Sequence, residues 1–319
     1  MRLLFSFIVF TVSISTFATD EHCNSSRLDI HQSSLTTIPI WNQGKSNLCY
    51  AFAASVLIDH KRGQLHDEPL ENFTSPLALA AQTVHYASNK SKRTTFWGGS
   101  LDQSISSALQ SGTCNAGWIS DQLGDEDLVS MISKLRKFHK QAYKKDTTLK
   151  QHISLEVITY LQALNAPKES IPKSFSIISM LEKKEDHFMG LLISSLCRKV
   201  ERKFLPDLKI KERGSVYNTG VSMAEKLNDL LSNKKTPTAI EFCADAVTNP
   251  NFATGYDSPC ARHYAVAVGQ RMVNGSCEIR MRDSQCDFYN SIQEGRCENG
   301  HYWIKRKHIL GNIDNISWL

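Results

Sequence analysis

The chain carries nine cysteines, an odd number that limits where it can fold and what one of its thiols can do. They run from Cys23 to Cys297 at irregular spacings, without the paired two-residue spacings of zinc-binding motifs. In an oxidising compartment cysteines pair as disulfides, and an odd count leaves one thiol over. We therefore expect up to four disulfides, whose connectivity the spacings leave open, one free cysteine and no metal site.

Residues 1–19 have the pattern of a secretory signal peptide, in agreement with the cysteine content. One positive charge, Arg2, precedes an apolar run over residues 3–12, and small residues follow up to Ala18 and Thr19. The run is too short and too rich in Ser and Thr to span a bilayer comfortably, so an uncleaved anchor is the weaker interpretation. We expect cleavage near Ala18 or Thr19, a secreted or periplasmic protein, and no stable membrane insertion afterwards.

Composition is typical of a globular protein with a packed core. Of the 319 residues, 41% are hydrophobic. The formal net charge of +5 comes from 37 basic against 32 acidic residues and is spread over many segments. Such a small excess does not predict a nucleic-acid partner.

Hydrophobic periodicity separates a helical first part from a strand-rich last part. The predicted helices begin at Cys49 and cover about 75–87 and 101–110, and the predicted strands lie at 238–242, 264–268, 277–281 and 302–305. From about residue 121 onward the middle of the chain is rich in Lys, Leu, Ser and Glu with helical periodicity. Helices followed by an antiparallel sheet predict an α+β fold.

Cys49 has the strongest chemical context of the nine cysteines. A thiol attacks as its thiolate, so a catalytic cysteine needs positive charge nearby, which the N-terminus of a helix provides. Gln43 lies six residues earlier. A side-chain amide and the backbone N–H of the cysteine can together hold the charge that develops on an attacked carbonyl oxygen. Taken alone, a disulfide half and a polar loop residue are the ordinary interpretations of these two positions.

Two segments resemble the active-site segments of papain-like cysteine peptidases. The first is residues 43–53, Gln-Gly-Lys-Ser-Asn-Leu-Cys-Tyr-Ala-Phe-Ala. The second is residues 262–269, Arg-His-Tyr-Ala-Val-Ala-Val-Gly, in which His opens a run of small and β-branched residues that ends in Gly. The resemblance implies Cys49 as the nucleophile, His263 as the general base and Gln43 as the oxyanion donor.

The third catalytic position departs from the family, which has Asn followed by Ser-Trp. Here the sequence is Asp283-Ser284-Gln285. Asp283 can accept from the imidazole N–H as Asn does, and its charge additionally favours the imidazolium. The tryptophan that shields this bond in the family is missing, so we expect a site that is wetter or differently covered.

Strand register tests the assignment of Asp283. A two-residue turn at 274–275 would pair Asp283 with Val266, on the sheet face opposite to His263. The triad therefore requires an odd-length loop or a bulge, and a five-residue loop over 271–275 would set His263 across from Asp283. If the tight turn forms instead, the alternative orienting residues are Asp287 and Asn290.

Gly98-Gly99 is similar to the family's Gly-Gly segment, whose second glycine presents backbone groups to an extended substrate. A glycine there permits the close approach of a peptide strand, and an ordinary loop is the alternative. Residues 300–304, Gly-His-Tyr-Trp-Ile, resemble the closing strand of the family, for which we expect a packing role only.

The resemblance covers about residues 35–120 and 225–310. It implies one papain-like domain over 20–319, in which an N-terminal helical part packs against a C-terminal antiparallel β-sheet or barrel with the cleft between them. A mostly helical insertion at about 121–224 interrupts this domain, and a lid, a partner surface and an exosite are all open as its role.

The implied activity is hydrolysis of peptide bonds in a peptide or protein substrate through an acyl-enzyme, without a cofactor. Two alternatives stay open. The same thiol chemistry serves an amidase or acyl transferase acting on cell-wall or other peptides. The altered residues after Asp283 also suit an inactive papain-like domain that binds peptides.

Overall fold

The computed structural model describes most of the chain outside its N-terminus. The described residues are 23–44, 46–66, 73–88, 95–115, 127–164, 166, 168–197, 212–215, 220–245, 260–286, 297–310 and 312–319. The predicted signal peptide over residues 1–19 lies outside them, as do Asp287 and Asn290.

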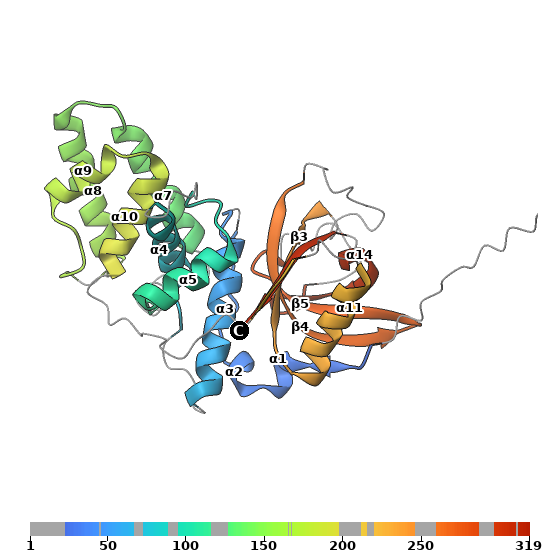
Figure 1. Cartoon of the computed structure of the whole chain (residues 1–319). Coiled ribbons are helices and arrows are strands. Elements are labelled where there is room, and N and C mark those ends of the chain that lie inside the picture. Colours follow the sequence, from blue (N-terminus) through green and yellow to red (C-terminus); the bar gives the residue numbers. More distant parts are fainter. Residues whose placement is uncertain are drawn as a thin grey trace, which may run out of the picture.

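Helix α3 (Cys49–His66) stands between the helical part of the molecule and the sheet (Figure 1). It packs against strands β3 (Thr238–Cys243) and β4 (Arg262–Val273) on one side and against helices α4 (Pro76–Ser88) and α5 (Leu101–Ser111) on the other. Every residue from Leu48 to His60 is buried. A helix covered all round is apolar all round, and this explains the run of Ala, Phe, Val and Leu after Cys49.

The sheet is antiparallel and open. Its strands follow the order β2-β7-β3-β4-β5-β6, and the short strand β1 pairs with β4 beyond the end of β3. The remaining strands are β1 (Ser26–Arg27), β2 (Glu212–Ser215), β5 (Ser276–Arg282), β6 (His301–Lys305) and β7 (Ile313–Trp318). The α+β prediction is confirmed, with a sheet and not a barrel among the described residues. Strand β7, next to β3, was not predicted.

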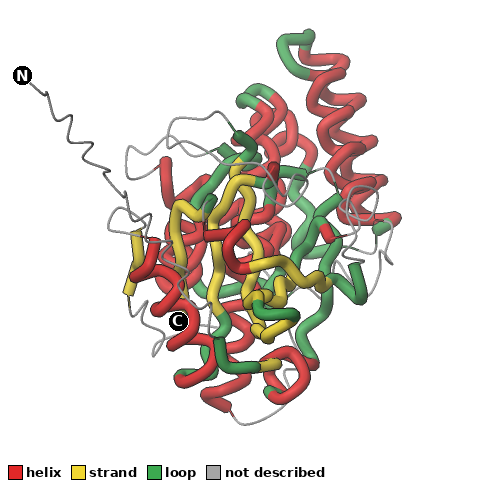
Figure 2. Tube along the Cα trace, turned by 90° about the vertical axis from the view of Figure 1, so that its right-hand side faces the viewer, coloured by secondary structure: helices red, strands yellow, loops and turns green. Residues whose placement is uncertain are grey.

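The second face of the sheet is covered by α11 (Gly220–Asn228), a π-helical turn (Asp229–Asn233) and α14 (Arg306–Leu310), which lie across the sheet from α3 in Figure 1. Helices α1 (Leu28–His31) and α2 (Ser33–Thr36) carry the chain from β1 to the start of α3. The tube in Figure 2 shows the strands of the sheet with helices around them.

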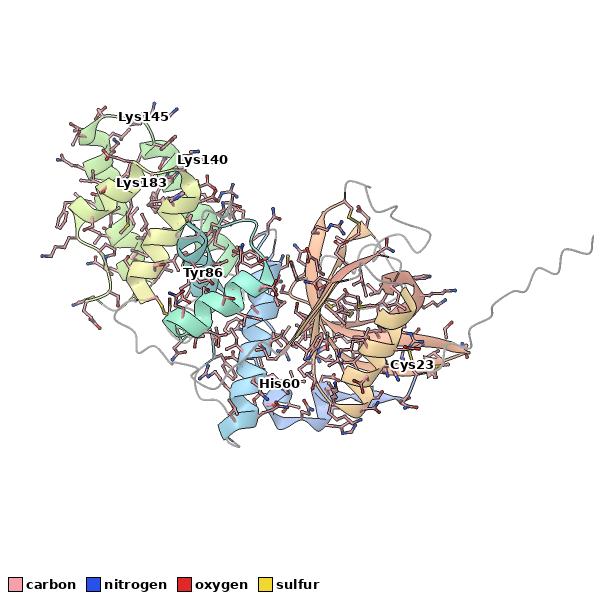
Figure 3. The ribbon with its side chains drawn as sticks, in the orientation of Figure 1. Cys23, His60, Tyr86, Lys140, Lys145 and Lys183 are labelled. Carbon is pink, nitrogen blue, oxygen red and sulfur yellow. A yellow bond between two sulfur atoms is a disulfide. The ribbon has the colours of Figure 1, made fainter. Side chains whose placement is uncertain are left out.

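Four further helices lie within the middle region: α7 (Asp127–Ala142), α8 (Thr147–Ala163), α9 (Ser174–Leu181) and α10 (Glu185–Cys197). Helix α10 packs on α4, and a disulfide joins its last residue, Cys197, to Cys114. Lys140, Lys145 and Lys183 lie at the end of this group that is farthest from the sheet (Figure 3). The insertion thus extends the helical part of the molecule; a partner for it stays a prediction.

Eight of the nine cysteines form four disulfides, and all nine lie within the described residues. The pairs are Cys23–Cys277, Cys114–Cys197, Cys243–Cys260 and Cys286–Cys297. Cys49 is the free cysteine. The predicted count of four bridges and one free thiol is confirmed. Along the described ranges, no helix combines the length and apolarity needed to cross a bilayer.

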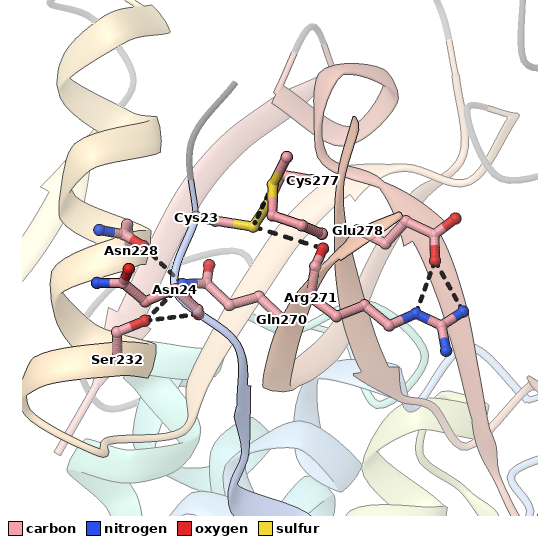
Figure 4. The surroundings of a disulfide bond; sticks show 9 residues. Cys23, Asn24, Asn228, Ser232, Gln270, Arg271, Cys277 and Glu278 are labelled. Carbon is pink, nitrogen blue, oxygen red and sulfur yellow. Dashed lines mark hydrogen bonds and ion pairs between the residues drawn. A yellow bond between two sulfur atoms is a disulfide. The ribbon is translucent and has the colours of Figure 1, made fainter. Parts of the chain in front are cut away.

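The N-terminal segment is fastened to the sheet by both covalent and polar contacts. Figure 4 shows Cys23 bonded to Cys277, and the backbone carbonyl of Asn24 accepts from Ser232 Oγ at 3.0 Å and from Gln270 Nε2 at 3.0 Å. Immediately afterwards β1 pairs with Gly269 and Gln270 of β4. A Cβ atom at Gly269 would lie 2.5 Å from the carbonyl oxygen of Ser26, so only glycine allows β1 to approach this closely.

We predict that Gly269→Ala destabilises the protein by about 1–3 kcal/mol, because the added methyl group collides with backbone that the Cys23–Cys277 disulfide holds in place. Gly190→Ala in α10 is the matched control, since its Cβ would meet nothing closer than 3.6 Å. Alanine in a helix interior is favoured over glycine by roughly 1 kcal/mol. Urea unfolding should give opposite shifts for the two variants, and equal shifts would contradict the explanation.

Candidate active site

Cys49 is the first residue of α3 and is 8% exposed. The backbone N–H groups of Ala51 and Phe52 donate to the carbonyl of Leu48 at 2.8 and 3.1 Å, which closes the first turn around it. The N–H groups of a first turn lack partners within the helix, and with the helix dipole they create a positive potential that stabilises a thiolate. The position of Cys49 is the one expected from the sequence.

His263 reaches Cys49 from β4. The imidazole is 2% exposed and forms a hydrogen bond with the Cys49 side chain. Its Nε2–H donates to both carboxylate oxygens of Asp283, at 2.8 and 2.9 Å. Because the carboxylate occupies Nε2, Nδ1 is the ring nitrogen left for the thiol. The structure thus brings three of the predicted residues into one chain of hydrogen bonds.

The charge of Asp283 determines the protonation of His263. Burial by itself would lower the pKa of the imidazole, but the negative charge of Asp283 and its hydrogen bond, together with Cys49, raise that pKa from 6.5 to about 10. At neutral pH the histidine is therefore an imidazolium. A cation held beside the thiol is what a thiolate nucleophile requires.

Asp283 reaches His263 because of a bulge, and not because of a long loop. The turn between β4 and β5 is the tight one, with Asn274 and Gly275 at φ 48° and 75° and Val273 paired with Ser276. The register then shifts between Ala267 and Gly269, where Val268 is an additional residue in β4.

Beyond the bulge Val266 pairs with Arg282, so Asp283 continues opposite Ala265, on the face of His263. The five-residue loop is wrong, and so is the expectation that the tight turn excludes Asp283. The bulge, which is the other predicted solution, is the one present.

Aromatic residues other than the tryptophan of the family pattern cover the pair of His263 and Asp283. The Phe242 ring meets the His263 ring edge-on at 5.4 Å between centroids. Tyr302 Oη donates to Asp283 Oδ2 at 3.0 Å, and Trp41 lines the same small cavity as Asp283. Asp283 is only 3% exposed, so the pair is differently covered and not wetter.

Tyr302 was missed as a site residue. The segment 300–304 was expected to pack only, yet it also supplies the Gly300 carbonyl that accepts from the Asp283 backbone N–H at 2.9 Å. A tyrosine in the strand that follows Asp283 along the chain is the signal that could have identified it.

Gln43 is buried in the loop that leads to Cys49, and its amide is held on both sides. Its Oε1 accepts from Ser284 Oγ at 2.6 Å, and its Nε2 donates to the Ser46 carbonyl at 2.8 Å. Each amide Nε2 carries two hydrogens, so one stays available to a developing oxyanion. Ser284, which follows Asp283 directly, thereby links Asp283 to the predicted oxyanion donor.

Gly99 lies beside Tyr50, the residue that follows Cys49, and Gly98 lies beside Thr95. The Tyr50 ring packs on Gly99, where a Cβ would lie 2.5 Å from the nearest ring carbon, and Tyr50 Oη donates to the Phe96 carbonyl at 3.0 Å. Burial raises the pKa of the Tyr50 hydroxyl, which keeps it protonated as a donor. The glycine is thus required by internal packing, in addition to any substrate contact.

The arrangement provides a nucleophile, a proton carrier and an oriented amide at one place. In the part of the chain that the structure describes, no group of three or more His, Cys, Asp or Glu side chains is placed to hold a metal ion.

No protein-family model matches the chain, and no curated protein matches it. Solved cysteine proteases are similar to it in structure. Xylellain, a cysteine protease from Xylella fastidiosa, is 15% identical, with 93% of this chain and 86% of that one covered and a TM-score of 0.49. A cysteine protease from Carica candamarcensis is 14% identical, with 92% and 96% covered and a TM-score of 0.45. The digestive procathepsin L2 proteinase of Tenebrio molitor larval midgut is 13% identical, with 93% and 68% covered and a TM-score of 0.46.

We predict that Asp283→Asn lowers the His263 pKa by at least one unit, because the buried imidazolium loses its nearby negative charge while the hydrogen bond is kept. NMR titration of the His263 ring carbons measures this directly. Tyr302→Phe is the control, since it removes a donor to Asp283 without removing charge. An unchanged pKa of about 10 in Asp283→Asn would contradict the assigned cause.

Stability gives a second readout with a defined sign. The folded pKa of His263 lies above 6.5, so the imidazolium stabilises the fold fully below pH 6.5, and this contribution is lost as pH rises toward about 10. The difference in unfolding free energy between wild type and Asp283→Asn should therefore shrink across this interval.

Proposed function

We propose that the protein is an exported cysteine endopeptidase. The observation that carries the proposal is the buried chain of hydrogen bonds from the Cys49 thiol through the His263 imidazole to the Asp283 carboxylate, at the N-terminus of a helix. The resemblance of residues 43–53 and 262–269 to the papain-like segments supports the same assignment independently. The chemistry assigned to Cys49, His263, Asp283 and Gln43 needs no cofactor.

The reaction proceeds in two halves. The Cys49 thiolate attacks the peptide carbonyl carbon and forms an S–C bond, while the carbonyl oxygen takes up the negative charge. When the C–N bond breaks, His263 gives its proton to the leaving amine, and an acyl-enzyme thioester is left. His263 then takes a proton from water, the hydroxide adds to the thioester, and the acid is released with the thiolate restored. Asp283 keeps the imidazole oriented throughout.

The oxyanion is held by the second Nε2 hydrogen of Gln43 and by the backbone N–H of Cys49. Both groups are fixed before substrate arrives, since Ser284 and Ser46 hold the Gln43 amide. Donors that need no reorganisation stabilise developing charge better than water does.

Export fits the covalent structure of the fold. Four disulfides are typical of proteins that fold outside the reducing cytosol, and the pattern of residues 1–19 supplies the route. A peptide or protein is the corresponding substrate. Product analysis separates this activity from an amidase or acyl transferase, because only a peptidase releases new α-amino and α-carboxyl ends.

We predict that an epoxide which alkylates papain-like thiols labels Cys49 in the mature, mildly reduced protein, and that His263→Ala abolishes this labelling. Loss of the imidazolium removes the cation that stabilises the thiolate. His152→Ala is the matched control, because His152 is exposed on α8 and pairs only with Glu156 among the residues described. Peptide mass mapping locates the adduct. A folded protein that resists labelling would favour a peptide-binding domain instead.

We predict that Gln43→Ala lowers kcat for peptide hydrolysis by about 10²–10³, because one oxyanion donor is lost. Alkylation of Cys49 by iodoacetamide should be unaffected, since that reaction forms no oxyanion. Asn47→Ala is the control in the same loop, where the Asn47 side chain is exposed. A parallel fall in alkylation and hydrolysis for Gln43→Ala would show that the loop, and not the oxyanion, is disturbed.

A further inference from the structure

The helical insertion touches the substrate-binding side of the candidate site at the segment 95–99. In α7, the Arg136 guanidinium lies 4.6 Å from the centre of the Trp97 ring. In α10, burial raises the pKa of the Asp186 carboxyl, and the nearby backbone N–H of Phe96 acts against this shift. Arg136 Nε and Glu185 Oε1 form an ion pair at 2.7 Å, which joins the two helices at this point.

The same segment is attached to the catalytic helix from its other side. Thr95 and Gly98 form an isolated β-bridge that closes a tight turn. Within it, the Phe96 carbonyl accepts from Tyr50 Oη, and Gly99 packs on the Tyr50 ring. Phe96 is fully buried between these contacts. The position of Gly98 and Gly99 therefore depends on Tyr50 on one side and on the contact of Arg136 with Trp97 on the other.

Anchoring of the insertion does not explain these contacts. Helix α10 already packs on α4, and the Cys114–Cys197 disulfide fixes its end covalently. The Arg136 and Glu185 side chains are 42% and 23% exposed, and ion pairs at that exposure add little to stability. The contact of Arg136 with Trp97 instead fixes the turn at 95–99 at the residue directly before Gly98.

We propose that Arg136 is a positioning residue for the binding of extended peptides, acting through Trp97 on the Gly98–Gly99 segment. This inference rests on the proposed function for its substrate class. An extended peptide that pairs with the Gly98–Gly99 backbone requires these groups at hydrogen-bonding distance along its length. A small thiol reagent requires only Cys49 and His263.

The test compares substrates of the two kinds in Arg136→Ala. We expect KM for fluorescein-labelled casein, an unfolded protein rich in extended segments, to rise about three- to tenfold with kcat within about twofold. The rate of Cys49 alkylation by iodoacetamide should stay unchanged. Arg136→Lys should restore part of the KM, because it keeps a cation near the Trp97 ring. Lys137→Ala, an exposed neighbour on α7, is the matched control and should equal wild type.

A second measurement separates this inference from the catalytic proposal. In a Cys49→Ala background, binding of the labelled casein is followed by fluorescence anisotropy, and adding Arg136→Ala should weaken it by the same three- to tenfold. An unchanged KM and an unchanged affinity overturn the positioning role. So does an equal loss of alkylation and hydrolysis, which indicates general damage. If wild type cleaves no casein, the proposed function fails and the anisotropy alone decides the positioning role.

Discussion

One additional residue in β4 makes the candidate site possible. Without the bulge at Val268, the tight turn at Asn274-Gly275 would direct Asp283 to the face of the sheet opposite His263. The bulge is stabilised by its surroundings, since Val268 is buried and Gly269 lies under β1. The N-terminal segment, its disulfide to Cys277 and the register of the catalytic strands are therefore parts of one structural unit.

Three consecutive residues, 282–284, follow one another at the end of β5, and each holds a different part of the candidate site. Arg282 is buried and donates to the backbone carbonyls of the segment that leads to the catalytic loop: Leu35, Ile38 and Pro39. Asp283 orients the imidazole, and Ser284 holds the Gln43 amide. Burial lowers the pKa of Arg282 to about 10, which still leaves it a full cation at neutral pH. A shift of this strand end would disturb the loop before Cys49, the His263 ring and the Gln43 amide together.

The sequence predicted what local patterns determine. Cys49 at a helix start, the α+β order and the count of disulfides follow from periodicity, composition and arithmetic. The bulge could be named only as one of two solutions, because a bulge depends on what packs against the strand and not on the strand's own residues. Tyr302 and Phe242 were missed for the same reason, since Tyr302 approaches Asp283 from β6 and Phe242 approaches His263 from β3. The contact of Arg136 with Trp97 could not be predicted either, because no sequence motif connects the two segments that it joins.

The two sides of the candidate site are held by different kinds of interaction. On the sheet side, Cys260 lies three residues before His263 and Cys286 three residues after Asp283, and both are in disulfides. Disulfides reduce the conformational freedom of the segments they close. On the helical side, the turn at 95–99 is held by hydrogen bonds, ring packing and one cation over an indole. Displacing His263 and Asp283 would therefore move segments that disulfides close, whereas displacing Gly98 and Gly99 would break non-covalent contacts.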